Sequence, residues 1–384
     1  MRILYGVVGE GMGHATRSRV VLERLLQRGH EVRVVVSGRA HQFLVEQLEP
    51  YSNVTIEEIH GFRLSYFGNR LDKGDSFIQA LRKAPEDLLQ NLRVYRKVAE
   101  DGFRPELVIS DFESWAGLYG LNHSLPVICL DNLHIIDRCH HDPAVTAPDS
   151  FSRRLTRLAV QIKVPGTSHF LITSFFFPPV AKRRTTLLPP ILRPAIEQAR
   201  REPGDHVLVY QTSSSNDDLI PTLRKLPQRF RVYGMGRVGT EGNVQLCAFS
   251  EQGFVDDLRT ARAAIAGGGF TLLSETVSLR IPTFSVPIEE QHEQELNARY
   301  LAHLHYGAWA PAIDGDVLSD FLARTDEYAH HLASYPRPNS EMLFACLDEL
   351  FERFAAGDLR PDRLDSPAMG KWPGSADDEE PPSG

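Results

Sequence analysis

The N-terminal stretch that decides the fold reads MRILYGVVGEGMGHATRSRVVLERLLQRGHEVRVVV (residues 1–36). Residues 3–8 are apolar and predict a buried strand, which ends in a glycine-rich turn. Apolar residues at helical spacing follow, Gly29 ends that helix, and residues 32–36 predict a second strand. A strand, a helix and a strand within about 35 residues form a βαβ unit, so we expect parallel strands.

The same alternation continues along the chain and predicts an α/β protein with two Rossmann-like domains. Residues 106–110 and 126–130 are further strands of the first domain, and a proline-rich stretch follows at 178–203. A second series of strands and helices begins at residue 206, and a late amphipathic helix at 340–356 would pack across the domains. We expect the two domains to face each other across a cleft, with a first domain at 1–185, a linker at 186–204, a second domain at 205–358 and a disordered acidic tail at 359–384.

The composition argues against several classes of protein. With 384 residues, of which 42% are hydrophobic, the chain can bury a core in each of two domains. Its net charge of −8 provides no basic field that would attract a nucleic acid. The four cysteines include no C-x-x-C pair, which argues against a zinc ribbon and favours a reducing cytoplasm. No apolar run reaches the roughly 20 residues of a membrane span.

A glycine-rich segment, GEGMGHATRS at residues 9–18, directly follows the first strand. Glycines in this place let the amides of a helix N-terminus approach an anion or a substrate. His14 would lie at the carboxyl edge of the parallel sheet, where ligands bind in such folds. Its neutral imidazole can take a proton from a hydroxyl group. The alternative is an ordinary tight turn between a strand and a helix.

Asp111 directly follows the strand at 106–110 of the same predicted sheet. This strand end could lie close to His14, where a carboxylate would orient the ring and stabilise its protonated form. The alternative is that Asp111 only caps the next helix. We predict the His14–Asp111 pair because a third motif supports the same chemistry.

That third motif is the most specific one, and it runs from GGGFTLLSE at residues 267–275 to EQELN at residues 293–297. A glycine turn opens a helix whose free amides and dipole suit a diphosphate. Glu275 would lie about one turn into this helix, where a carboxylate could bind the hydroxyls of a ribose. A second loop then supplies the polar pair Glu293 and Gln294.

This block resembles the donor-binding signature of the GT-B glycosyltransferase superfamily, which groups plant and bacterial UDP-glycosyltransferases with the lipid II-forming N-acetylglucosaminyltransferase. The opening G-x-G-M-G-H is similar to the first loop of that superfamily, and the resemblance spans residues 1–310. It implies a metal-independent, inverting transfer from a UDP-sugar to a hydroxyl acceptor, with His14 as general base and Asp111 as its partner. It also implies a set of donor-binding residues: Gly11, Gly13, Ser213, Ser214, Val255, Gly268, Gly269, Phe270, Thr271, Glu275, Glu293 and Gln294.

Within this resemblance, the backbone of Val255 would contact the nucleobase and Glu275 would hold the ribose. The residues from 268 to 271 would line the diphosphate, and residues 293 and 294 would contact the sugar. Plant enzymes have a histidine where this chain has Gly267, so the phosphates here would depend more on backbone amides. Glu293 replaces the aspartate of many relatives, which leaves the identity of the sugar open.

Two other functions remain open at this stage. One is a nucleotide-sugar epimerase on the same two-domain body, and the other is a donor-binding subunit that works with a separate acceptor subunit. A base at His14 fits transfer better than either. Three further motifs are set aside: GMGRVG at residues 234–239, which precedes a strand instead of a helix; the adjacent pair His140 and His141, which point apart; and the pair Asp217 and Asp218, which lacks D-x-D spacing.

The acceptor side has the weakest sequence signals. The basic run at 182–184 closely follows the apolar residues 170–177, and the aromatic residues Phe62, Tyr66 and Phe67 lie among the basic residues Arg63, Arg70 and Lys73. Apolar residues edged by cations can dock a protein on an anionic membrane. This would place the protein at the inner face of the membrane, with a lipid-linked acceptor. The alternative is that residues 170–177 form a buried strand and the basic run a solvated turn.

Overall fold

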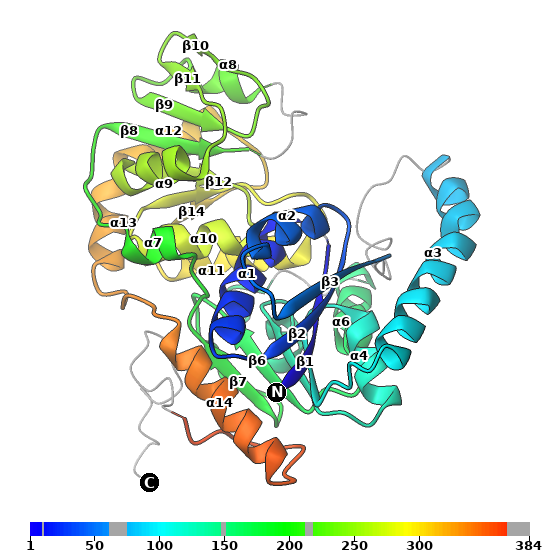
Figure 1. The fold of residues 1–384 in the computed structure, drawn as a ribbon. Helices are drawn as coiled ribbons and strands as arrows, with labels where there is room; N and C mark the ends of the chain where they lie inside the picture. The colour runs from blue at the N-terminus through cyan, green and yellow to red at the C-terminus, as the bar shows by residue number, and fades with distance from the viewer. Residues whose placement is uncertain (10, 61–74, 147–150, 212–217, 367–384) are drawn as a thin grey trace, which may run out of the picture.

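Two seven-stranded sheets form the body of the protein (Figure 1). The computed structural model describes residues 1–9, 11–60, 75–146, 151–211 and 218–366, and of residues 75–85 only the backbone. Neighbouring strands of the described sheets run parallel except β10 with β11. Parallel neighbours need crossover connections, which is why helices alternate with strands along the chain. The predicted α/β fold with two Rossmann-like domains is confirmed.

The first sheet has the order β3-β2-β1-β4-β5-β6-β7. The strand order reverses between β1 and β4, where Val7 pairs with Asp111, and such a switch point leaves a crevice at the carboxyl ends of the strands. The strands of this sheet are β1 (Arg2–Val7), β2 (Glu31–Ser37), β3 (Val54–Ile59), β4 (Leu107–Asp111), β5 (Val127–Asp131), β6 (His169–Thr173) and β7 (Thr185–Leu188).

The helices of this half connect its strands. Helix α1 begins after Gly11, whose φ of 85° lies in the left-handed region that glycine adopts easily, so the chain turns sharply from β1 into the helix. The helices are α1 (Met12–Gln27), α2 (Arg39–Leu48), α3 (Asp75–Glu100), α4 (Ser114–Asn122), α5 (Ile135–Arg138) and α6 (Phe151–Lys163).

The second sheet has the order β10-β11-β9-β8-β12-β13-β14, and its order reverses between β8 and β12. Its strands are β8 (His206–Tyr210), β9 (Arg229–Tyr233), β10 (Gly239–Glu241), β11 (Val244–Leu246), β12 (Ala263–Ala266), β13 (Thr283–Ser285) and β14 (Gly307–Trp309). Its helices are α7 (Pro194–Gln198), α8 (Leu219–Leu223), α9 (Glu251–Thr260), α10 (Phe270–Ser278), α11 (His292–His303), α12 (Gly315–Ala323) and α13 (Thr325–Leu332).

The last helix, α14 (Glu341–Ala355), returns to the first sheet. Its apolar residues Leu343, Leu347 and Leu350 join a core cluster with β1, β2 and α1, and this cluster contains no residue of the second sheet. The helix therefore completes the first core instead of packing across the two domains. The segment after it also returns to the first sheet, because Arg184 N donates to Asp362 O at 3.0 Å.

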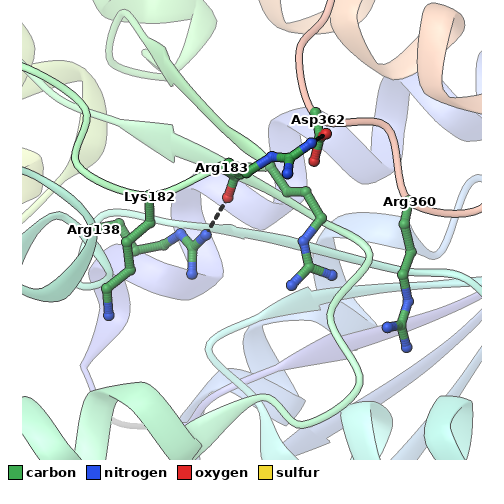
Figure 2. Close-up of a pocket in the computed structure, with 6 residues that line it drawn as sticks. Arg138, Lys182, Arg183, Arg360 and Asp362 are labelled. Carbon is green, nitrogen blue, oxygen red and sulfur yellow. Dashed lines mark hydrogen bonds and ion pairs between the residues drawn. The ribbon is translucent and has the colours of Figure 1, made fainter.

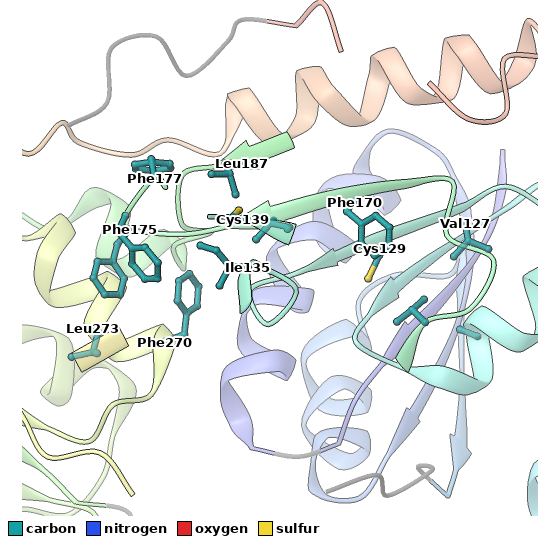
Figure 3. Close-up of a cluster of buried hydrophobic side chains, with 14 of the residues drawn as sticks. Val127, Cys129, Ile135, Cys139, Phe170, Phe175, Phe177, Leu187, Phe270 and Leu273 are labelled. Atoms are coloured by element: carbon teal, nitrogen blue, oxygen red, sulfur yellow. The ribbon is translucent and has the colours of Figure 1, made fainter. Parts of the chain in front are cut away.

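The apolar residues 170–177 are buried, as the alternative expectation has it. Phe175 and Phe176 are each 1% exposed and lie in a core cluster shared by both halves of the chain. Figure 3 shows Phe175 beside Phe270 and Leu273 of α10, and the rings of Phe175 and Phe270 stack at 6.3 Å. These side chains hold the two domains together, so they are not available to a membrane. None of the described helices is long and apolar enough to cross a bilayer.

Candidate active site

His14 and Asp111 meet at the switch point of the first sheet. His14 lies in the first turn of α1, directly after β1, and Asp111 is the last residue of the neighbouring β4. Nδ1 of His14 lies 2.8 Å from Oδ1 of Asp111. Because a carboxylate only accepts hydrogen bonds, this contact favours the tautomer with the proton on Nδ1 and with Nε2 as the acceptor. Nη2 of Arg17 also lies 2.6 Å from Nδ1, and in this tautomer it donates to Oδ1 of Asp111 and not to the ring. The His14 side chain is 16% exposed and that of Asp111 is 1% exposed, so only the ring reaches solvent.

The Asp111 carboxylate has two further partners on α1, three and four residues after His14 and thus one helical turn away from it. Arg17 donates from Nε to Oδ2 at 3.0 Å and from Nη2 to Oδ1 at 2.5 Å, and Ser18 donates from Oγ to Oδ2 at 2.9 Å. Burial alone would raise the pKa of Asp111, but the charge of Arg17 and the hydrogen bond from His14 hold it below its usual value. Asp111 therefore stays ionised near neutral pH.

The N-terminus of α10 from the second domain lies against the N-terminus of α1. A Cβ placed on Gly13 would stand only 2.5 Å from Oγ1 of Thr271, so any larger residue would force the Thr271 side chain to move. Helix α10 begins after Gly269, and neither helix has a side-chain cap at its N-terminus. The first N–H groups of both helices therefore remain for an anion, which the helix dipoles also favour.

Residues 291–297 lie against the glycine turn that precedes α10. A Cβ on Gly268 would stand 2.4 Å from the carbonyl oxygen of Gln294, and Asn297 donates from Nδ2 to Gly268 O at 3.0 Å. The side chain of Gln294 is folded onto its own loop, where Oε1 accepts from Ile288 N at 3.1 Å. The predicted glycine turn and the polar segment are thus in contact, as a shared binding site requires.

Glu293 connects the two domains at the same place. Its Oε1 accepts from Asn297 Nδ2 at 2.8 Å and from Nδ2 of Asn132, at the end of β5, at 2.9 Å. Oδ1 of Asn132 accepts in turn from Nη1 of Arg17. Burial raises the pKa of Glu293, while the Asn297 hydrogen bond and the charges of His14 and Arg17 oppose that shift. A chain of polar contacts therefore runs from Asp111 in the first domain to Glu293 in the second.

Glu275 is buried in α10 and forms an ion pair with Arg193, which precedes α7. Arg193 donates from Nε to Oε1 at 2.7 Å and from Nη2 to Oε2 at 2.8 Å. Both carboxylate oxygens thus accept from one guanidinium, although each can accept one further hydrogen bond. Burial raises the pKa of Glu275, and the charge of Arg193 opposes the shift. A ribose bound by Glu275 would share this carboxylate with Arg193.

The predicted nucleobase contact at Val255 does not lie at the N-terminus of its helix. Helix α9 begins at Glu251, with Ser250 as its N-cap. Val255 is therefore one turn inside the helix and buried, and the free N–H groups of the first turn belong to the residues before it. Ser213 and Ser214 lie outside the described residues.

Sequence reasoning missed Arg17, Asn132 and Arg193. Arg17 lies three residues after His14, on the same helix face, and this spacing could have indicated it. Asn132 directly follows the strand end at Asp131, the kind of position that yielded Asp111. Arg193 carries no local signal, because its partner Glu275 is 82 residues away.

Of the residues set aside in the sequence analysis, His141 is held by two hydrogen bonds, and Asp217 lies outside the described residues. His141 hydrogen-bonds to Tyr300 at 2.8 Å and to the carbonyl oxygen of Ile135 at 2.9 Å. The D-x-D spacing that Asp217 and Asp218 lack is present at Asp314 and Asp316. Asp314 caps α12 there by accepting from the backbone N–H of Asp316 at 2.9 Å.

One buried group has the composition of a metal site and lies in the first core, behind the switch point. It consists of Cys129, Asp131 and His134. Asp131 Oδ2 accepts from His134 Nδ1 at 2.6 Å and from the Cys129 thiol at 3.0 Å. These contacts have hydrogen-bond lengths, and they fix the loop that carries Asn132.

The carboxyl edges of two parallel α/β sheets face each other at this junction, an arrangement that defines the GT-B class of glycosyltransferases. The structure of Phytolacca americana UGT2 complexed with UDP-2fluoro-glucose and pterostilbene has this fold, with a TM-score of 0.63, 12% identity, and coverage of 93% of this chain and 99% of that one. The crystal structure of Acinetobacter baumannii MurG is similar, with a TM-score of 0.57, 16% identity, and coverage of 90% and 98%.

The chain belongs to the family described as Glycosyl transferase family 1, which matches residues 1–326. A Methanosarcina acetivorans protein named as an uncharacterized glycosyltransferase is 24% identical over 333 residues, which cover 80% of this chain and 85% of that protein. The protein is therefore a glycosyltransferase with the GT-B fold.

Proposed function

We propose that this protein is an inverting glycosyltransferase that moves a sugar from a UDP-sugar to a hydroxyl group, with His14 as general base. The observation that carries the proposal is the hydrogen bond from His14 Nδ1 to the buried Asp111, at the carboxyl edge of the first sheet. Nε2 of the ring then accepts the proton of the acceptor hydroxyl, and the adjacent carboxylate stabilises the imidazolium that forms. Arg17 and Ser18 hold that carboxylate in place.

The leaving diphosphate is assigned to the N-terminus of α10. The turn of Gly268 and Gly269 lets backbone N–H groups approach the phosphates closely, and no side chain caps this helix. These amides and the helix dipole stabilise the negative charge that develops as the bond to the sugar breaks. A site of this kind does not require Mg²⁺, so we propose a metal-independent reaction.

The positions of base and leaving group also suggest the stereochemistry. His14 belongs to the first domain and the diphosphate site to the second, so the base and the leaving group approach the sugar from opposite domains. A deprotonated acceptor that attacks opposite the diphosphate displaces it in one step. We therefore propose inversion, in which an α-linked donor yields a β-linked product.

The remaining donor contacts follow from the same placement. Glu275, together with Arg193, would hold the ribose, and the start of α9 near Val255 would lie at the nucleobase. Thr271 would line the diphosphate, and Glu293 and Gln294 would contact the sugar. Phe270 would contribute its backbone N–H, because its side chain is buried in the core shared by both domains.

The acceptor carries a hydroxyl group, and we propose that it is lipid-linked and is reached from the cytoplasmic face of a membrane. With residues 170–177 buried, peripheral membrane contact would rest on cationic side chains such as Arg183, whose side chain is 81% exposed. Flotation with anionic and neutral vesicles tests this contact. Salt-sensitive flotation supports it, and no flotation under any condition leaves a soluble acceptor.

A panel of nucleotide sugars tests the reaction. We expect nucleotide release with a UDP-sugar in the presence of an acceptor, unchanged turnover in EDTA, and an inverted anomeric configuration by NMR. Loss of turnover in EDTA with recovery in Mn²⁺ would contradict the metal-independent mechanism. A retained configuration would contradict the direct displacement.

A further inference from the structure

A cationic cavity lies at the edge of the first sheet, away from the switch point. Its volume is about 530 Å³, and its lining consists of Arg138, Lys182, Arg183, Arg184, Arg360 and Asp362. Figure 2 shows that these side chains come from the segment before β7, from the end of α5 and from the segment after α14. In the sheet order, β7 is the edge strand and lies three strands from β4, so the cavity is separate from His14 and Asp111.

Only part of the positive charge of this cavity is neutralised by the protein. Lys182 Nζ contacts both carboxylate oxygens of Asp137 at 2.7 Å, and Arg183 forms an ion pair with Asp362. Arg138, Arg184 and Arg360 have no carboxylate partner in an ion pair among the described residues. Three uncompensated guanidinium groups thus surround one cavity, in a protein whose net charge is −8.

Two of these guanidinium groups are held in place. Arg138 lies over the ring of Phe170 at 3.7 Å and donates from Nε to Thr185 Oγ1 at 2.7 Å and from Nη2 to Arg183 O at 2.5 Å. Arg184 donates from Nη1 to Thr167 O at 3.1 Å. Burial and the nearby charge of Arg184 lower the pKa of Arg138. The two positive charges therefore repel each other where no anion lies between them.

We propose that this cavity binds a ligand through a phosphate group. Guanidinium groups present paired N–H donors that match the oxygens of a phosphate, and an anion between Arg138, Arg184 and Arg360 would relieve their mutual repulsion. The phosphate can belong to a free metabolite or to a lipid headgroup. In either case it is a second ligand of the protein, in addition to the donor at the junction of the domains.

Calorimetric titration of the full-length protein with inorganic phosphate tests the proposal. Arg360→Glu changes a cavity residue that has no hydrogen-bond or ion-pair partner within the described parts of the chain, so folding should be unaffected. Arg363→Glu is the matched control, because it makes the same charge change on an exposed residue of the same segment outside the cavity. Loss of one charge-assisted hydrogen bond corresponds to about tenfold weaker binding or more.

We expect phosphate affinity to fall at least about tenfold in Arg360→Glu and to be unchanged in Arg363→Glu. Arg184→Asn should weaken binding similarly, since asparagine tolerates the φ of 58° at this position. Any weak phosphate binding at the donor site would be common to all variants. Nucleotide release in phosphate-free buffer should be the same in Arg360→Glu and the wild type.

Flotation with phosphatidic acid vesicles distinguishes the two sources of the phosphate. Flotation that Arg360→Glu abolishes and Arg363→Glu does not would assign a lipid headgroup, and phosphate binding without flotation would assign a free metabolite. Equal phosphate affinity in both variants would overturn the proposal. Phosphate binding that appears only after removal of residues 367–384, with their acidic run DDEE at 377–380, would also overturn it, because the chain itself would then fill the cavity.

Discussion

Among the described residues, His14 and Arg17 are the two side chains that form ion pairs with the buried Asp111, and replacement of Arg17 by methionine removes the permanently charged one. Asp111 would keep the hydrogen bonds from His14 and Ser18. It would lose two hydrogen bonds from the guanidinium of Arg17 and the interaction with its positive charge. Removal of one partner of a buried ion pair typically costs about 3–5 kcal/mol. We expect the free energy of unfolding of Arg17→Met to fall by about this amount at pH 7.

Urea unfolding at several pH values measures this effect. In the wild type the pKa of Asp111 is lowered, so its stabilisation is present above the pKa of the unfolded chain and is lost as the pH falls through the folded value. In the variant the carboxylate is buried without Arg17 and should be protonated at a higher pH. The difference between the free energies of unfolding of the wild type and Arg17→Met should therefore be largest near neutral pH, and it should decrease as the pH falls.

Two further variants make the interpretation specific. Arg24→Met removes a surface arginine of the same helix, whose ion pair with Glu341 at 3.4 Å should contribute less than about 1 kcal/mol. Asp111→Asn combined with Arg17→Met should cost less than the sum of the single changes, because the two side chains interact directly. A loss in Arg17→Met no larger than in Arg24→Met would refute the role of Arg17 as the support of Asp111.

Three more predictions concern the domain junction and the core behind it. Gly13→Ala should lower turnover, because the added methyl group would collide with Thr271 Oγ1. The double variant with Thr271→Ala should recover part of the turnover, and equal turnover of Gly13→Ala and the wild type would contradict the close approach. Asn132→Ala should raise KM for the donor by breaking the link to Glu293, and an unchanged KM would count against that link. Burial raises the pKa of Glu113 to about 7, so its contribution to stability is present below the unfolded pKa and is lost as the pH rises toward 7. The stability of Glu113→Gln relative to the wild type should therefore increase between pH 4.5 and 7 in urea unfolding, and a flat difference would show that Glu113 titrates normally.

The architecture could be predicted because its signals are local. Alternating strands and helices with glycine turns specify parallel sheets, and strand ends specify the edge at which His14 and Asp111 meet. The sheet against which α14 packs could not be predicted. Its apolar stripe indicates that one face of the helix is buried, but it does not indicate which sheet covers that face. The Arg193–Glu275 ion pair and the contact of Gly13 with Thr271 likewise depend on how two distant segments are brought together.

The most direct test of the central claim is the turnover of His14→Ala, measured together with its affinity for UDP. A general base typically contributes about 10²–10⁴-fold to the rate, and His14 belongs to the first domain, whereas all the predicted donor-binding residues except Gly11 and Gly13 belong to the second. We predict that turnover falls by about this factor while UDP affinity is nearly unchanged. Full turnover in His14→Ala would show that another group takes the proton from the acceptor and would contradict the account.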